Sequence, residues 1–264
     1  MTLQEQKQLA LKKITDSQIV DLAVKNYIDP NYLKGFDEVE GSGIGFSDYT
    51  GRMLIQFEPS WMKRFLLQDK EPVTGTWLNN GIGNQTVEYK AFEAACQSDK
   101  EAAMKSCSIG MMQVMGFHFK DLGFSSVQNM WSYADQSEIN QLNLGVEFIK
   151  SNPVLYKAVK EKNSSVVAYY YNGAGYLALA KKLHELPYDK RLDNAYNKFS
   201  SASTIHKTTT TVNIRRGAGV SFDLAGDPLR VNTVVSILGY HNDWTHVAVV
   251  ATGITGWVYS KYIN

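Results

Sequence analysis

Apolar residues recur at helical spacing over most of the first 198 residues of the chain. The run at 14–27 (ITDSQIVDLAVKNY) places its apolar side chains on one helical face, and the pattern resumes at 32–40 (YLKGFDEVE) after a break at Asp29-Pro30. Runs of the same kind follow at 88–107, 138–153, 164–172 and 192–200. Turn-forming residues dominate 41–51 (GSGIGFSDYTG) and 76–84 (TWLNNGIGN). The pattern predicts a mainly α-helical domain over residues 1–198.

The pattern changes towards the C-terminal end. Residues 199–209 are rich in Ser and Thr and have no apolar period, which predicts a linker. Beyond it, short β-branched runs at 211–216, 230–240, 245–252 and 256–264 are separated by Gly, Asn and Asp. These runs predict a small antiparallel barrel over 210–264. The expected fold class is therefore α+β and multi-domain, with a mainly α domain followed by a small all-β barrel.

Composition narrows the classes of function. A formal net charge of +1 over 264 residues gives no strong attraction to nucleic acid or to anionic membranes. The two cysteines, Cys96 and Cys107, are too few for a disulfide framework and fit folding in a reducing cytosol. The first residues, MTLQEQKQLALKK, have no apolar segment of the secretory type, and no run reaches the roughly 20 apolar residues of a membrane helix. We expect a monomer without stable membrane association.

Glu40 is the first candidate for chemistry. It ends a predicted helix at Val39-Glu40-Gly41-Ser42-Gly43, and Phe36 and Val39 precede it on that helix. A carboxyl held against apolar groups has a raised pKa and can act as a general acid near neutral pH. The alternative is a glutamate on the surface at the end of a helix, since Glu is seldom buried.

Two further segments carry candidate binding residues. In residues 106–115 (SCSIGMMQVM), a glycine-containing turn leads into a run whose single polar residue is Gln113, an amide that can bond to sugar hydroxyls. The alternative for that run is a buried helix whose methionines are core. In residues 168–176 (AYYYNGAGY), Tyr171 and Asn172 precede a Gly-rich turn. That turn is also compatible with a plain helix C-cap.

In this order and spacing the three segments resemble the branch of the lysozyme superfamily that includes goose-type lysozymes and soluble lytic transglycosylases. Within it, residues 15–198 look closest to the N-acetylmuramidase family of phage endolysins, through VEGSGIGF, RMLIQFEPSWMKRF, KSCSIGMMQVMGFHF and YYYNGAGY. The chain departs from the family pattern at Cys107, where a small residue such as Ala is expected, and at Tyr170, where the family often has Ala.

The resemblance implies roles for particular residues. Glu40 takes the place of the general acid that protonates the glycosidic oxygen between MurNAc and GlcNAc. The resemblance assigns Glu58 a supporting role as second glutamate, for which a structural ion pair is the alternative. It places Ser108 in the turn before the G-M-M-Q run, and it places the side chains that line the sugar cleft at Gln113, Tyr171 and Asn172.

Two outcomes of the reaction stay open. A second carboxylate could activate water and give hydrolysis, or the MurNAc 6-hydroxyl could attack and give the 1,6-anhydro product of a lytic transglycosylase. The carboxylates near enough in sequence to serve are Asp37, Glu38, Asp48 and Glu58.

The C-terminal segment resembles bacterial SH3 domains, which in endolysins bind the cell wall. Val212-Asn213-Ile214-Arg215-Arg216-Gly217 matches their opening strand, and the stretches around Asn242-Asp243-Trp244, Gly256-Trp257-Val258 and Tyr262-Ile263 match later strands. The resemblance implies a wall-binding module with Trp244, Trp257 and Tyr262 as its candidate contacts. The alternative is a barrel in which these rings only pack.

Other classes compete less well. A Cys/His endopeptidase needs a thiolate near a histidine, and Cys107 with His118 is the one plausible pair. A non-catalytic wall-binding or virion protein is a further alternative. We find no ligand spacing for a metal and no phosphate-loop or dinucleotide motif, so we expect neither metal nor cofactor. The resemblance implies an endolysin made in the host bacterial cytoplasm during phage infection, without a signal peptide, that reaches peptidoglycan after release through a membrane lesion; an antibacterial toxin is the alternative source.

Overall fold

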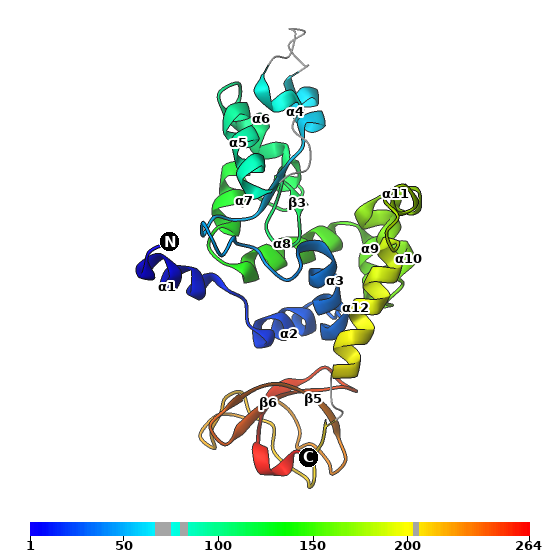
Figure 1. Cartoon of the computed structure of the whole chain (residues 1–264). Coiled ribbons are helices and arrows are strands. Elements are labelled where there is room, and N and C mark those ends of the chain that lie inside the picture. Colours follow the sequence, from blue (N-terminus) through cyan, green and yellow to red (C-terminus); the bar gives the residue numbers. More distant parts are fainter. Residues whose placement is uncertain (67–74, 80–83, 203–205) are drawn as a thin grey trace.

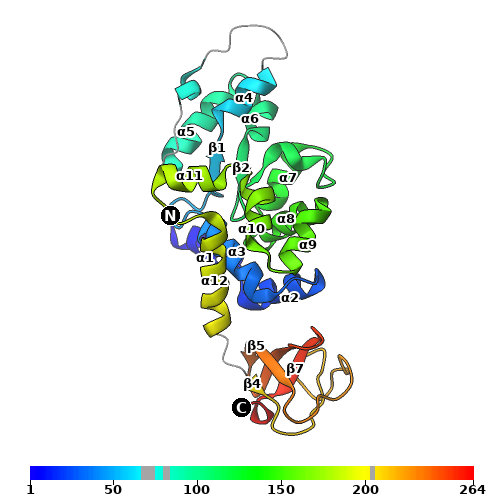
Figure 2. The same cartoon turned by 90° about the vertical axis from the view of Figure 1, so that its right-hand side faces the viewer.

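The structure is a computed structural model, and it describes residues 1–66, 75–79, 84–202 and 206–264. A helical region is followed by a small β-rich region that lies at one end of the molecule (Figures 1 and 2). The described helices are α1 (Leu3–Lys12), α2 (Asp16–Lys25), α3 (Pro30–Gly41), α4 (Pro59–Leu66), α5 (Gln85–Cys96), α6 (Lys100–Lys105), α7 (Val127–Ala134), α8 (Glu138–Ser151), α9 (Pro153–Lys160), α10 (Ser164–Val167), α11 (Tyr176–Leu183) and α12 (Tyr188–Ala202). Short helical turns occur at Thr76–Asn79, Gly116–Phe119, Ala168–Asn172 and Ser260–Tyr262.

Capping residues at both ends of the sequence of α3 set where this helix begins and ends. The Asp29 carboxylate accepts hydrogen bonds from the backbone N–H groups of Asn31 and Tyr32, and Pro30 takes the first helical position, where no N–H is needed. At the other end Ser42 and Gly43 both adopt the left-handed conformation, with φ of 55° and 72°. The helix therefore stops at Gly41, one residue after Glu40.

A three-stranded antiparallel sheet lies within the helical region. Its strands are β1 (Ile55–Phe57), β2 (Cys107–Ile109) and β3 (Val114–Met115), in that order. Gln56 faces Ser108 across the first pair, and Ser108 faces Met115 across the second. The helix expected over residues 88–107 is divided into α5 and α6, and the alternative of a buried helix for 106–115 is wrong, because this segment forms a hairpin.

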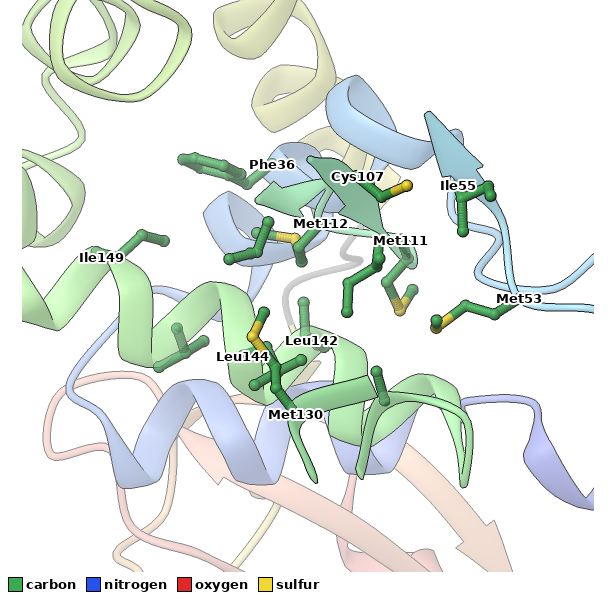
Figure 3. Packing of buried hydrophobic residues seen from close by; sticks show 14 of the residues in the cluster. Phe36, Met53, Ile55, Cys107, Met111, Met112, Met130, Leu142, Leu144 and Ile149 are labelled. Carbon is green, nitrogen blue, oxygen red and sulfur yellow. The ribbon is translucent and has the colours of Figure 1, made fainter. Parts of the chain in front are cut away.

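The main core lies between this sheet and the helices α3, α7 and α8 (Figure 3). Met111 and Met112 are fully buried there, so the methionine run is core packing. Helix α12 also packs along α3. At Gly35 a Cβ would lie 2.9 Å from the backbone nitrogen of Tyr196, so the absence of a side chain permits this close approach.

The C-terminal region contains a four-stranded antiparallel sheet of β4 (His206–Lys207), β5 (Val234–His241), β6 (Trp244–Val249) and β7 (Thr255–Tyr259), in that order. Isolated bridges, including Arg215 to Trp257, attach the preceding loops to it. Within the described residues β4 and β7 do not pair, so the four strands do not by themselves form the closed barrel that we expected, although a bridge joins Thr208 to Ile263.

Helix α12 and strand β4 occupy both ends of the tract expected to be a linker. The helix continues to Ala202 and the strand begins at His206. The sheet also packs on the helical region, since Val20 and Val24 of α2 contact Leu238 and Ala248. In the part of the chain that the structure describes, none of the helices has both the length and the apolar character needed to cross a membrane.

Candidate active site

Glu40 lies in the last turn of α3, where the helix end meets the hairpin turn between β2 and β3. Gly41 makes this contact possible, because a Cβ at that position would lie 2.3 Å from the carbonyl oxygen of Met111. The turn itself needs the left-handed conformation at Gly110 and Gln113, with φ of 67° and 47°. The helix end and the hairpin turn are therefore held against each other, and Glu40 lies at their junction.

The carboxyl of Glu40 is half-buried, and its Oε1 accepts a hydrogen bond from the hydroxyl of Tyr188. Burial raises the pKa of Glu40 to about 7, although the hydrogen bond from Tyr188 and the positive charge of Arg191 oppose the rise. A negative charge at the C-terminal end of a helix is also disfavoured by the helix dipole. Glu40 thus keeps a substantial protonated fraction near neutral pH, as a general acid requires.

Tyr171 lies beside Glu40 but is engaged with the protein. Its hydroxyl donates to the carbonyl oxygen of Met112 at 2.7 Å, and its ring packs edge-on against Phe36 and Phe148, with centroids 4.6 and 5.4 Å away. The next residue, Asn172, is exposed at the end of the helical turn Ala168–Asn172. Of these two candidates, Tyr171 braces the hairpin turn, and Asn172 has an amide open to a ligand.

The candidates Ser108 and Gln113 bind each other. The Ser108 hydroxyl donates to Gln113 Oε1 at 2.7 Å, and Gln113 Nε2 donates to the carbonyl oxygen of Gly110 at 2.6 Å. Because Gln113 is only partly buried, its second amide N–H can still reach a ligand. The pair closes the hairpin turn on which Glu40 packs.

Glu58 follows β1 on the same face of the sheet as Ser108. Gln56 is opposite Ser108, and side chains two positions apart share a face, so Glu58 extends this row of polar groups. Gln56 Nε2 donates to Glu58 Oε1 at 2.7 Å. Burial raises the pKa of the Glu58 carboxyl above its ordinary value, and the charge of Glu88 adds to the rise, whereas the bond from Gln56 opposes it.

The other candidate carboxylates differ in their surroundings. Glu38 forms an ion pair with Lys198 at 2.6 Å, and Asp48 forms one with Lys13 at 3.1 Å. Asp37 is 5% exposed, and its Oδ1 has no hydrogen-bond partner among the described residues. Burial raises the pKa of Asp37 to about 7, with further contributions from the charges of Glu138, Glu38 and Glu40.

The Cys/His pair does not form a catalytic centre. The thiol of Cys107 is fully buried on the core side of the sheet, and burial raises its pKa well above the usual range. His118 has its Nδ1 3.2 Å from a carboxylate oxygen of Asp121 and packs on Phe148. Within the described segments, no three His, Cys, Asp or Glu side chains are grouped as metal ligands would be.

The three aromatic candidates of the C-terminal region are on two different surfaces. Trp244 and Tyr262 line one hollow of about 910 Å³, together with Tyr259, Arg215 and Lys261. The ring of Trp257 instead stacks on His246, with centroids 4.7 Å apart. It lines a second hollow, between the sheet and α2.

The sequence pattern did not identify Tyr188 and Arg191, which set the environment of Glu40. Both lie on α12, about 150 positions after Glu40, and Arg191 also donates to the carbonyl oxygen of Val39 at 3.3 Å. No local motif marks them. The helical period around 192–200 predicted the helix that carries them, but not its packing against α3.

The chain is similar in sequence and in fold to known proteins. The model of the N-acetylmuramidase family matches residues 29–200. The crystal structure of the Burkholderia AP3 phage endolysin superimposes with a TM-score of 0.63 and 30% sequence identity, covering 72% of this chain and 72% of that one. Curated protein sequences give no significant match. The chain therefore belongs to the N-acetylmuramidase family and is a peptidoglycan-hydrolysing muramidase related to phage endolysins.

Proposed function

We propose that Glu40 is the general acid of this muramidase and that the bond it cleaves is the β-1,4 linkage between MurNAc and GlcNAc. The observation that carries the proposal is its half-buried carboxyl, with a pKa of about 7, at the junction of α3 and the hairpin turn. Its proton passes to the glycosidic oxygen as the bond to C1 of MurNAc breaks and an oxocarbenium-like transition state develops. Exposed Asn172 and the free N–H of Gln113 are the proposed sugar contacts.

Glu58 is the proposed second carboxylate. Glu38 and Asp48 are held in ion pairs, and Asp37 is buried. Glu58 is half-buried and lies on the polar face of the sheet, in line with Ser108. In its ionised form it accepts a proton from water, whose oxygen bonds to C1 of MurNAc, and the product is a reducing MurNAc end.

The products of digestion test this reaction. Purified peptidoglycan is treated with the wild-type chain, and the released muropeptides are analysed by mass spectrometry with and without borohydride reduction. Reducing MurNAc ends, which gain two hydrogens, support hydrolysis. Anhydro-MurNAc ends, which do not, identify a lytic transglycosylase, in which the MurNAc 6-hydroxyl attacks and no second carboxylate is needed. Free peptide termini contradict both.

We further propose that the C-terminal region is an SH3-like module that anchors the enzyme to the wall. The hollow that contains Trp244 and Tyr262 supports this, since it joins aromatic faces to two cations, Arg215 and Lys261. Lys261 lies over the ring of Tyr262 at 4.9 Å. Such a surface suits the sugars and carboxylates of peptidoglycan.

Binding to purified cell-wall sacculi tests the anchor. Trp244→Ala should lower the bound fraction in a sedimentation assay. The control is Tyr240→Ala, because Tyr240 is 70% exposed on the same sheet but outside the hollow. Equal binding by wild type and Trp244→Ala contradicts this location for the anchor.

The relationship to phage endolysins also suggests how the enzyme reaches the cell wall. We expect the enzyme to be made in the bacterial cytoplasm during phage infection and to reach the wall through a lesion formed by another protein. Expression in a bacterium with and without a co-expressed pore-forming phage protein tests this route. Lysis that depends on the pore supports it, and lysis without the pore contradicts it.

A further inference from the structure

A buried carboxylate on α8 joins three segments of the chain. Glu138, 1% exposed, accepts hydrogen bonds from the backbone N–H groups of Ile14 and Gly45, each at 2.9 Å. The ammonium of Lys13 lies 3.3 Å from the same oxygen that Gly45 contacts. Glu138 therefore links the end of α1 to the loop that follows Glu40.

Helix α8 thus contacts both segments that lie next to Glu40, which are the loop after α3 and the hairpin turn between β2 and β3. Glu138 fixes the loop at Gly45, and Gln141, one turn later, accepts a hydrogen bond from the N–H of Met111 at 2.9 Å. A Cβ at Gly45 would lie 1.9 Å from Gln141 Oε1, so the loop fits closely against α8. The position of Glu40 relative to the hairpin turn depends on these two polar anchors.

Lys13 provides the positive charge for this anchor. It contacts Glu138 at 3.3 Å and Asp48, in the same loop as Gly45, at 3.1 Å. Burial opposes its charge, but the bond with Asp48 and the charge of Glu138 outweigh burial and raise the pKa of the Lys13 ammonium. A buried carboxylate that loses its counter-ion is strongly destabilised. Lys13 is the counter-ion of Glu138 at the same oxygen atom that accepts the hydrogen bond from Gly45.

We propose that Lys13 is a positioning residue of the muramidase site, acting through Glu138 to hold the loop after Glu40. Lys13 lies before residues 29–200, the part of the chain that matches the family model. The segment before residue 29 then contributes to the geometry of the active site through Lys13. The proposal rests on the proposed role of Glu40 as the acid.

Three variants test it. Lys13→Gln removes the charge, Lys13→Arg keeps it, and Lys7→Gln is the matched control, because Lys7 is exposed on α1 and forms no ion pair within the described residues. The first readout does not depend on activity. Amide exchange is followed by NMR at Gly45 and, in the same sample, at Leu144 and Ile149 in the interior of α8.

Faster exchange at Gly45 alone in Lys13→Gln, by about tenfold or more and reversed in Lys13→Arg, supports the anchor. Unchanged exchange at Gly45 overturns it. Equal acceleration at Gly45, Leu144 and Ile149 also overturns it, because Lys13 then acts on global stability alone. This readout stands even if Glu40 proves not to be the acid.

The second readout is the rate on soluble glycan chains. A displaced Glu40 reduces the stabilisation of the transition state more than it reduces substrate binding. In Lys13→Gln, kcat should therefore fall about tenfold, with KM changed by less than about twofold. Lys13→Arg should recover most of kcat, and Lys7→Gln should match the wild type. A wild-type kcat in Lys13→Gln, or an equal loss in Lys7→Gln, overturns the proposal while leaving the role of Glu40 intact.

Discussion

The hydroxyl of Tyr188 donates a hydrogen bond to the carboxyl of Glu40, although the two residues are 148 positions apart in the chain. The contact exists because α12 packs along α3 and Tyr188 is its first residue. Two opposing effects therefore act on Glu40. Burial favours the neutral acid, and the bond from Tyr188 moderates that preference.

Removal of this bond should move the pH profile. Activity of the wild type should fall as pH rises through the Glu40 pKa of about 7, because the acid loses its proton. In Tyr188→Phe the hydrogen bond that lowers the pKa of Glu40 is absent, so the alkaline limb of the kcat profile should shift to higher pH. The loss of one buried hydrogen bond should lower stability by about 1 kcal/mol. An unchanged or downward-shifted limb would contradict this account.

Asp37 should make folding stability depend on pH. Its folded-state pKa of about 7 lies above the ordinary value of 3.8, so the folded chain binds a proton that the unfolded chain releases. The stability that protonated Asp37 contributes to the folded state is fully present below about pH 4 and is lost as pH rises through 7. Asp37→Asn removes this loss, which amounts to at most about 4 kcal/mol for a shift of this size. Denaturant unfolding at pH 5 and pH 8 measures it, and equal pH dependence in both proteins would contradict it.

Glu58 should be required for attack by water. If it is the second carboxylate, Glu58→Gln should lower the release of reducing MurNAc ends by about a hundredfold or more, because the general base is lost. Glu93→Gln is the control, since Glu93 is exposed and paired with Arg52. Retention of most activity in Glu58→Gln would reduce Glu58 to a structural role and favour a reaction without a second carboxylate.

Gly41 should tolerate no side chain. In Gly41→Ala the new Cβ would meet the carbonyl of Met111 at 2.3 Å, so the end of α3 must move away from the hairpin turn. We expect a loss of about 1–3 kcal/mol in stability and a reduced kcat. Gly239→Ala is the matched control, because a Cβ there meets no atom within 4 Å. Thermal unfolding and kcat of the two variants should differ clearly, and similar values would contradict the close contact.

The sequence predicts best where physical signals are local. The capped start of α3 at Asp29-Pro30 and its end in a glycine-rich segment placed Glu40 at a helix terminus, as the structure shows. The strands β1, β2 and β3 have only two or three residues each, too few for a recognisable alternation, so their pairing was not expected. Ser108 and Gln113 were both candidates, but their mutual bond follows from the hairpin.

Long-range contacts were outside the reach of sequence patterns. Nothing near Tyr188 or Lys13 indicates a site. The importance of Tyr188 comes from the packing of α12 on α3, and that of Lys13 comes from the contacts of the segment after α1 with Glu138 of α8. The same applies to Trp257, which was grouped with Trp244 as a wall contact. Its stacking on His246 follows from the register of β6 and β7, in which the two residues are directly opposite each other, and residues of α2 line the same hollow.

The most direct test of the central claim compares Glu40→Gln with Glu38→Gln in the digestion of purified peptidoglycan. Glu38 is the matched control, since it lies on the same helix and only pairs with Lys198 at the surface. Gln at position 40 can still accept the bond from Tyr188 but has no proton to give, so the variant should stay folded. We predict that Glu40→Gln releases no muropeptides above background and that Glu38→Gln matches the wild type. Undiminished release by folded Glu40→Gln would contradict the assignment of Glu40 as the acid.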